Sequence, residues 1–296
     1  MKTILSLLLG LALPAFAEEF SEKFEKIKDS GDHKSIAKFL EDAAENESEN
    51  PDFYALAGNH WWQIANSPSI TTKPADGDDL SVRDQKTGEE VGSISIAGKI
   101  NPELRAKAIA LLSEGSRKFP ERADLVLGLA SILTKTGDDA GAVAALLGLL
   151  ETSKKSPLKW TGNAGLPSKV ETFLPEAIQG YSADLYRNES EESDVLCAKL
   201  CDATISRFPD HPYAYNIKAA LASAQGKPEE SLKLLATAAE KAPDDPLVLL
   251  NLGDAYRNAG NIAKAKETYG KILSLEGADD SAKDEAKQAM EALNDK

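Results

Sequence analysis

The chain has 296 residues, of which 42% are hydrophobic and 28% are charged, and its formal net charge is −14. This amount of apolar material excludes an intrinsically disordered protein. The acidic balance argues against nucleic acid and anionic membranes as partners. An acidic surface that keeps the protein soluble explains the charge, and selectivity for a basic partner is the alternative.

The first seventeen residues are typical of a cleavable export signal. Lys2 gives a basic start, residues 4–13 form a short apolar run, and Pro14 is expected to break a helix there. Residues 15–17, Ala-Phe-Ala, have the small-x-small pattern of a cleavage site. An apolar run of about ten residues is too short to span a bilayer, which needs about twenty. We therefore expect cleavage near Ala17-Glu18 and a mature protein that is periplasmic or secreted.

Helical patterns follow in the first part of the mature chain. Residues 18–50 predict one helical pair, and residues 51–66 predict the first helix of a second pair, with Trp61 on its packing face. The second helix of this pair is expected only at 102–118, because the residues between do not have a helical pattern. The second pair therefore contains an insertion over 67–101.

The insertion has the pattern of strands. Leu80 and Val82, and later Ile94 and Ile96, alternate with polar residues around a turn at residues 86–88, Lys-Thr-Gly. Alternation on both sides of a glycine-containing turn predicts a β-hairpin. Further along, residues 157–177 contain proline, glycine and Trp160, which predicts a long loop.

A repeat is visible in the last third of the chain. Gly226 and Gly260 are 34 residues apart, as are Pro212 and Pro246. The last full unit carries Leu249, Leu252-Gly253 and Tyr256 on a first helix, Gly260 at a turn, and Ala265 and Tyr269 on a second helix. In residues and in period this unit resembles the tetratricopeptide repeat.

The resemblance implies an all-α fold, a right-handed superhelical solenoid of helix-turn-helix repeats, here with a small inserted β-hairpin. In such a repeat Gly253 and Ala265 are the small residues that let two antiparallel helices approach closely. The predicted units are residues 18–50, 51–122 with the insertion 67–101, 123–156, 178–211, 212–245 and 246–279, with a loop at 157–177 and a capping helix at 280–294.

The chain has two cysteines, Cys197 and Cys201. They fall where the best-matched unit has Ala265 and Tyr269, so both are expected to face the partner helix as buried structural thiols. Two side chains one helical turn apart are poorly placed for an unstrained disulfide. A disulfide, and a metal or redox role, are the alternatives.

An enzyme should concentrate titratable or nucleophilic residues that can converge, and this sequence does not. His33, His60 and His211 fall in different units, and neither a metal-ligand spacing nor a phosphate-binding glycine loop occurs. We therefore expect no catalysis, no cofactor and no metal.

The resemblance implies a binding surface, because first helices of successive repeats line a concave groove that takes a peptide. Trp62 is the most informative candidate, since its neighbour Trp61 takes the packing position and an exposed tryptophan is a typical hot spot. Cover by the inserted hairpin is the alternative for Trp62. The expected groove residues are Asn59, Trp62, Gln63, Tyr213, Asn216, Ser223, Asn251, Asp254 and Arg257.

The sequence thus predicts an exported scaffold that binds a protein or peptide, in envelope assembly or secretion. One alternative is a small-molecule carrier or hydrolase in which the hairpin and the Trp160 loop close over the groove. Another is a structural subunit that uses its end helices to build a larger assembly.

Overall fold

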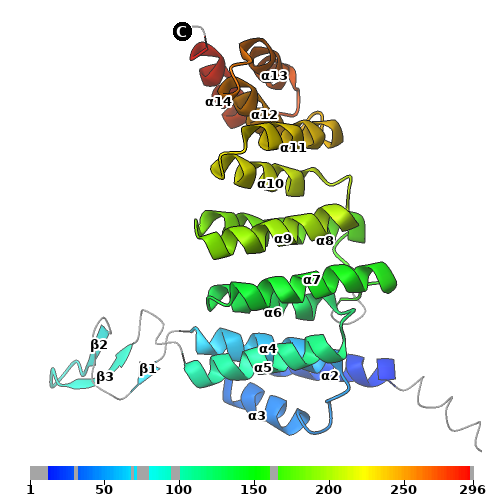
Figure 1. The fold of residues 1–296 in the computed structure, drawn as a ribbon. Helices are drawn as coiled ribbons and strands as arrows, with labels where there is room; N and C mark the ends of the chain where they lie inside the picture. Colours follow the sequence, from blue (N-terminus) through cyan, green and yellow to red (C-terminus); the bar gives the residue numbers. More distant parts are fainter. Residues whose placement is uncertain are drawn as a thin grey trace, which may run out of the picture. The chain divides into compact units, whose positions relative to one another are not determined.

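A computed structural model describes residues 13–29, 33–67, 70–71, 80–94, 101–160 and 166–293. The chain divides into two compact units. Unit 1 comprises Met1–Asp138 with Ser156–Gly165, and unit 2 comprises Asp139–Lys155 with Leu166–Lys296. Each unit is built of helices that pack in antiparallel pairs (Figure 1).

Unit 1 contains five described helices. Pro14 is included in the first of them, and the residues before Leu13, where a break would fall, are not described. Residues 1–12 of the expected export signal lie outside the described residues. The helices are α2 (Leu13–Lys28), α3 (His33–Ala43), α4 (Pro51–Ala65), α5 (Pro102–Lys118) and α6 (Ala123–Lys135).

Glycines set the close packing of α4 against α5. A Cβ atom on Gly58 would lie 2.6 Å from Cγ of Leu112, and one on Gly115 would lie 2.5 Å from Cβ of Tyr54. Each glycine therefore makes room for a large side chain of the other helix. Because residues 67–101 separate the two helices, this packing brings together parts of the chain that are distant in sequence.

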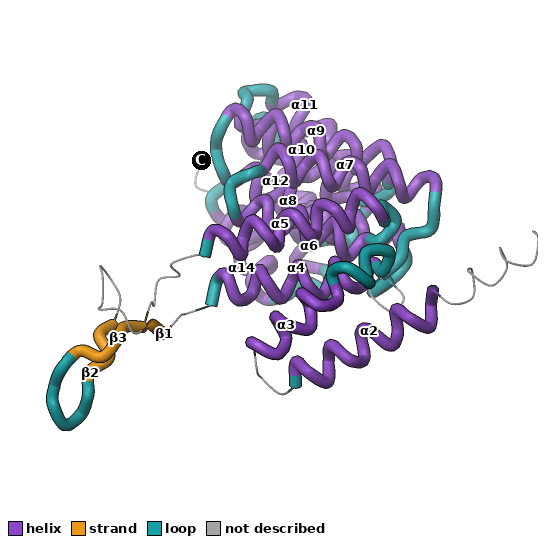
Figure 2. The backbone as a smooth tube through the Cα atoms, turned by 90° about the horizontal axis from the view of Figure 1, so that it is seen from below, coloured by secondary structure: helices purple, strands orange, loops and turns teal. Residues whose placement is uncertain are grey.

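The inserted segment forms a small sheet between α4 and α5 in the chain (Figure 2). Its strands are β1 (Ile70–Thr71), β2 (Leu80–Arg83) and β3 (Glu90–Ile94), in the order β1-β3-β2 and all antiparallel. The hairpin β2–β3 confirms the prediction, and its turn is closed by Asp84, whose carboxylate accepts from the N–H groups of Lys86 and Thr87 at 2.8 Å. Ile96 lies outside the described residues. The short strand β1 was not predicted.

The root of the insertion is closed by a hydrogen bond. The backbone N–H of Asn101 donates to the carbonyl of Ala65 at 3.1 Å. The side chain of Asn101 also caps α5 by accepting from the N–H groups of Glu103 and Leu104, both at 3.1 Å. The helix pair is therefore joined at its base as it would be by a short turn.

Unit 2 begins with α7 and continues through three further pairs and a final helix (Figure 1). The predicted loop 157–177 is too long, because a helix already begins at Val170. Its buried Leu174 and Ile178, one turn apart, hold the helix around Pro175. The helices are α7 (Asp139–Lys155), α8 (Val170–Arg187), α9 (Glu191–Arg207), α10 (Pro212–Ala224), α11 (Pro228–Lys241), α12 (Pro246–Asn258), α13 (Ile262–Ser274) and α14 (Asp280–Glu291).

The 34-residue period has a backbone cause. Gly226 and Gly260 have φ angles of +71° and +74°, and they form the turns from α10 to α11 and from α12 to α13. Residues with a Cβ atom rarely adopt this left-handed conformation. The predicted repeat over 123–156 contains α6 and α7, the first at the end of unit 1 and the second at the start of unit 2.

Candidate binding groove

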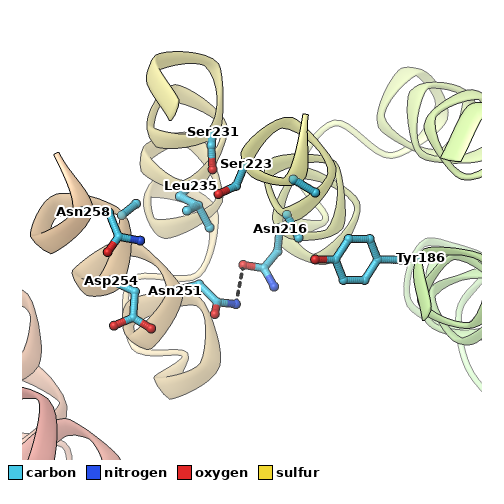
Figure 3. A pocket seen from close by; sticks show the side chains of 11 residues that line it. Tyr186, Asn216, Ser223, Ser231, Leu235, Asn251, Asp254 and Asn258 are labelled. Atoms are coloured by element: carbon cyan, nitrogen blue, oxygen red, sulfur yellow. Dashed lines mark hydrogen bonds between the residues drawn. The ribbon is translucent and has the colours of Figure 1, made fainter. Parts of the chain in front are cut away.

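Unit 2 has a hollow of about 330 Å³ bounded by α8, α10, α11 and α12 (Figure 3). Its apolar part consists of small or buried side chains, Ala220 and Ala224 of α10, Leu235 of α11 and Ala255 of α12. Polar side chains surround this floor. They are Tyr186, Asn216, Ser223, Ser231, Asn251, Asp254 and Asn258. We call this site the first hollow.

A second hollow, of about 400 Å³, lies between α12 and α14. From α12 it takes Leu247, Leu250 and Arg257, together with Asn251 and Asp254, which also line the first hollow. From α14 it takes Glu285, Gln288 and Ala289, and Ala292 follows at the C-cap of that helix. The two hollows are therefore neighbours along one groove with a common wall.

The sequence of α12 places its polar residues toward the hollows. Asp245 caps the helix by accepting from the N–H of Val248 at 3.0 Å. Leu249 and Leu252 are buried against neighbouring helices. Residues spaced by three and four lie on one face of a helix, so residues 251, 254 and 258 form a polar stripe on α12. This stripe forms one wall of the first hollow.

Two asparagines join neighbouring repeats across the first hollow. Nδ2 of Asn251 donates a hydrogen bond of 3.0 Å to Oδ1 of Asn216 (Figure 3). An amide side chain has two N–H donors and one carbonyl acceptor. The pair therefore retains donors on Asn216 and an acceptor on Asn251 for a ligand. Figure 3 shows the hydroxyl of Tyr186 directed toward Asn216.

Asp254 is held in place from two sides. Its Oδ1 accepts from the hydroxyl of Tyr269 at 2.6 Å and from Nη2 of Arg257 at 2.9 Å. Burial and the hydrogen bond to Asp254 raise the pKa of the Tyr269 hydroxyl, so it stays protonated as a donor. The side chain of Arg257 is 37% exposed. The result is a fixed carboxylate at the boundary of the two hollows.

Five of the predicted groove residues come together here, namely Asn216, Ser223, Asn251, Asp254 and Arg257. Tyr213 does not line either hollow. Its hydroxyl donates to Oδ2 of Asp245 at 2.7 Å, and this bond, with burial, raises the pKa of Tyr213 to about 12. Tyr213 thus ties the start of α10 to the cap of α12.

Several groove residues were missed by the sequence analysis. Asn258 follows Asn251 by two helical turns, so the spacing alone could have identified it. Tyr186 comes from the preceding repeat, and Glu285 and Gln288 come from a helix predicted only as a cap. No local signal in the sequence marks these three.

The remaining predicted residues belong to α4 in unit 1. Asn59 and Gln63 are exposed, and Trp62 is half-buried. The guanidinium of Arg105 lies 5.1 Å from the centroid of the Trp62 ring, and its Nη2 donates to Oδ1 of Asn66 at 2.7 Å. Among the described residues, the side chain that lies over the Trp62 ring is therefore that of Arg105 in α5. None of the three residues lines either hollow.

The cysteines have the surroundings of structural thiols. Cys197 and Cys201 are free and buried, and the thiol of Cys197 donates to the carbonyl of Ser182 at 3.2 Å. Contact with Cys201 and burial raise the pKa of Cys197, which keeps it a thiol. No group of metal-ligating side chains occurs among the described residues. In the same residues, no helix has the length and apolar character needed to cross a membrane.

Two models of known protein families match parts of the chain. One tetratricopeptide repeat model matches residues 104–157, and a second matches residues 222–284. The second match covers α11, α12 and α13, and the first two of these helices line the hollows. These two segments are therefore identified as tetratricopeptide repeats.

An uncharacterized protein of Aquifex aeolicus (strain VF5) is 26% identical over 197 residues. The match covers 64% of this chain and 25% of that protein, so the chain spans about a quarter of the relative's length.

Three solved structures illustrate the similarity. TTC0263 of Thermus thermophilus, a thermophilic TPR protein, has a TM-score of 0.41 at 15% identity, over 64% of this chain and 92% of that one. YrrB, described as a TPR protein with an unusual peptide-binding site, has a TM-score of 0.40 at 14% identity, over 63% and 85%. MamA has a TM-score of 0.40 at 14% identity, over 59% and 84%.

Proposed function

We propose that the groove of unit 2 binds an extended segment of a partner protein, and that the chain acts as an interaction scaffold. The observation that supports this most directly is the pair of neighbouring hollows that share Asn251 and Asp254. A row of small sites along one face suits successive side chains of a peptide. The asparagine amides suit its backbone, which presents both donors and acceptors.

Two rival functions have less support. A carrier or hydrolase closed by the inserted segments would need residues of 67–101 or the Trp160 loop at the groove, and the described residues of these segments are not among those that line the hollows. A structural subunit would need an end helix with an apolar face open for stacking. The final helix instead buries Ala282, Ala286 and Leu293 against the preceding pair.

The test is selection of random twelve-residue peptides displayed on phage against the immobilised protein, followed by titration of the selected peptides. The variant Ala224→Trp fills the mouth of the first hollow from an exposed position. Lys233→Trp, exposed on α11 outside both hollows, is the matched control. We expect Ala224→Trp to weaken binding at least tenfold and Lys233→Trp to leave it unchanged. Equal binding to all three proteins would refute the groove as the site.

We also propose that the protein acts after export, in envelope assembly or secretion. Lys2, the apolar run 4–13 and the Ala-Phe-Ala sequence at 15–17 support this proposal. Expression of the full chain in a bacterium, with mass spectrometry of the mature N-terminus, tests it. A fraction outside the cytoplasm that begins at Glu18 is expected. An uncleaved chain confined to the cytoplasm would contradict the proposal.

A further inference from the structure

The two hollows differ in chemistry, and this difference narrows the class of peptide. We infer that the groove selects a peptide in the polyproline II conformation that places an aliphatic side chain in the first hollow and a lysine or arginine, three residues away, in the second hollow. This inference rests on the proposed function, because it specifies the ligand of the same groove.

The first hollow suits an aliphatic side chain. Its floor is formed by Ala220, Ala255 and Leu235, and Leu235 is only 5% exposed. The polar groups stand around this floor, where Asn216 and Asn251 are already joined to each other. An apolar side chain that enters here removes its surface from water, and the remaining donors and acceptor of the asparagine pair stay available for the peptide backbone.

The second hollow suits a long basic side chain. Leu247, which is 50% exposed, and Leu250 supply an apolar wall. Asp254 and Glu285 supply two carboxylates against the single guanidinium of Arg257. Lysine and arginine bury their aliphatic stems on apolar surface and keep the charged end near polar groups. The leucines can take such a stem, and Glu285 with the open oxygen of Asp254 can take its charge.

The position of Arg257 strengthens this assignment. Its Nη2 is paired with Oδ1 of Asp254, so one of the two carboxylates in the hollow is already neutralised. Glu285 is exposed on the facing helix and supplies the remaining negative charge. The net charge of the whole chain, −14, adds a longer-range attraction for a cationic peptide.

The spacing follows from the stacking of helices. The first hollow lies between α10 and α12 and the second between α12 and α14, and these neighbours are in contact. Packed helices are about 8–10 Å apart. A polyproline II peptide rises about 3.1 Å per residue with three residues per turn, so residues i and i+3 share a face about 9 Å apart. In a β-strand, same-face neighbours are about 7 or 13 Å apart, which fits less well.

The experiment uses fluorescein-labelled ten-residue peptides, blocked at both ends, in an alanine and proline background. One carries leucine with lysine three residues later; the others replace lysine by glutamate, move lysine to two residues away, or replace leucine by alanine. Fluorescence anisotropy with the purified full chain gives each Kd. We expect the first peptide to bind about threefold to fivefold more tightly than the glutamate peptide and about tenfold more tightly than the alanine peptide.

A charge reversal in the protein tests whether the preference for lysine arises in the second hollow. Glu285→Lys should reverse the preference, so that the glutamate peptide binds more tightly than the lysine peptide. Glu276→Lys makes the same change of net charge at an exposed position outside the hollows and should keep the original order. Circular dichroism checks that both variants are folded.

The outcomes separate the two proposals. Equal affinity for the lysine and glutamate peptides, or a reversal by Glu276→Lys as well, would overturn this inference. If none of the designed peptides binds while phage-selected peptides bind and are blocked by Ala224→Trp, the proposed function stands and the specificity is wrong. If phage selection also finds no peptide for the groove, both proposals fail.

Discussion

A Cβ atom on Gly253 would lie 2.4 Å from Cε1 of Tyr269. The ring of Tyr269 therefore occupies the space that a side chain on α12 would need, and it is fully buried there. The hydroxyl group on this ring donates a hydrogen bond to Oδ1 of Asp254 in the groove. The close contact between α12 and α13 thus supports both the packing of the last repeat and the position of its carboxylate.

Gly253→Ala should destabilise the protein, although alanine is the better helix former by about 1 kcal/mol. The added methyl group would overpack the contact with Tyr269, and overpacking in a filled core costs about 1–3 kcal/mol. Urea denaturation followed by circular dichroism measures the free energy of unfolding. A variant as stable as the wild type would show that the ring moves freely away.

Gly270→Ala is the matched control on the neighbouring helix. A Cβ atom on Gly270 meets no heavy atom within 4 Å, and the residue lies inside α13. Alanine should therefore raise the free energy of unfolding by about 0.5–1 kcal/mol, because glycine loses more backbone entropy on folding. In the same denaturation experiment, we expect Gly253→Ala to lower the free energy of unfolding and Gly270→Ala to raise it.

Arg122→Met should strongly destabilise unit 1. Nη2 of Arg122 lies 2.7 Å from Asp52 of α4 and 2.8 Å from Asp124 of α6, and the three side chains are 3–9% exposed. Removal of one partner from a buried ion pair leaves an uncompensated charge, which costs about 3–5 kcal/mol. The exposed pair of Lys154 with Glu151 is the control, where Lys154→Ala should cost about 0.5 kcal/mol or less.

His211 should make stability depend on mildly acidic pH. Burial lowers the pKa of this imidazole below its ordinary value of 6.5, and the nearby Glu176 opposes the shift only in part. Below pH 6.5 the unfolded chain then binds more protons than the native protein, so the free energy of unfolding falls as the pH decreases. Between pH 7.5 and 5, we expect the wild type to lose more stability than His211→Gln. Parallel pH profiles for both proteins would exclude this effect.

Replacement of residues 68–100 by Gly-Ser-Gly should leave the pair α4–α5 folded. The ends of the insertion already meet through the hydrogen bond of Asn101 to Ala65, and Gly58 and Gly115 pack the helices independently of the sheet. Each halving of the loop length lowers the entropic cost of closing the loop by about 0.6 kcal/mol. A loop halved about three times therefore stabilises the folded pair by up to about 2 kcal/mol. Loss of cooperative unfolding in this variant would mean that the sheet supports the helices.

The repeats could be predicted because each has a local cause. Gly226 and Gly260 mark turns that require positive φ, and Gly253 with Tyr269 marks a close helix contact. The division into two units has no comparable mark in the sequence. The start of α8 was missed because Pro175 indicates a loop locally, whereas Leu174 and Ile178 gain more from burial in the helix.

The groove was predictable where its residues share one helix. Asn251, Asp254 and Arg257 follow each other by about one helical turn, so their common face could be read from the spacing. Tyr186 and Glu285 line the hollows from separate helices, and only the stacking of repeats brings them near α12. Trp62 had the chemistry of a hot spot, but it lies in unit 1 under Arg105.

One helical turn of α12, from Asn251 to Asp254, belongs to both hollows of the groove. A single codon change at Asn251 or Asp254 therefore alters two neighbouring sites at once. Tyr186 and Glu285 each line one hollow only. A change at either of these residues can therefore alter one end of the groove separately, whereas its middle cannot change without affecting both ends.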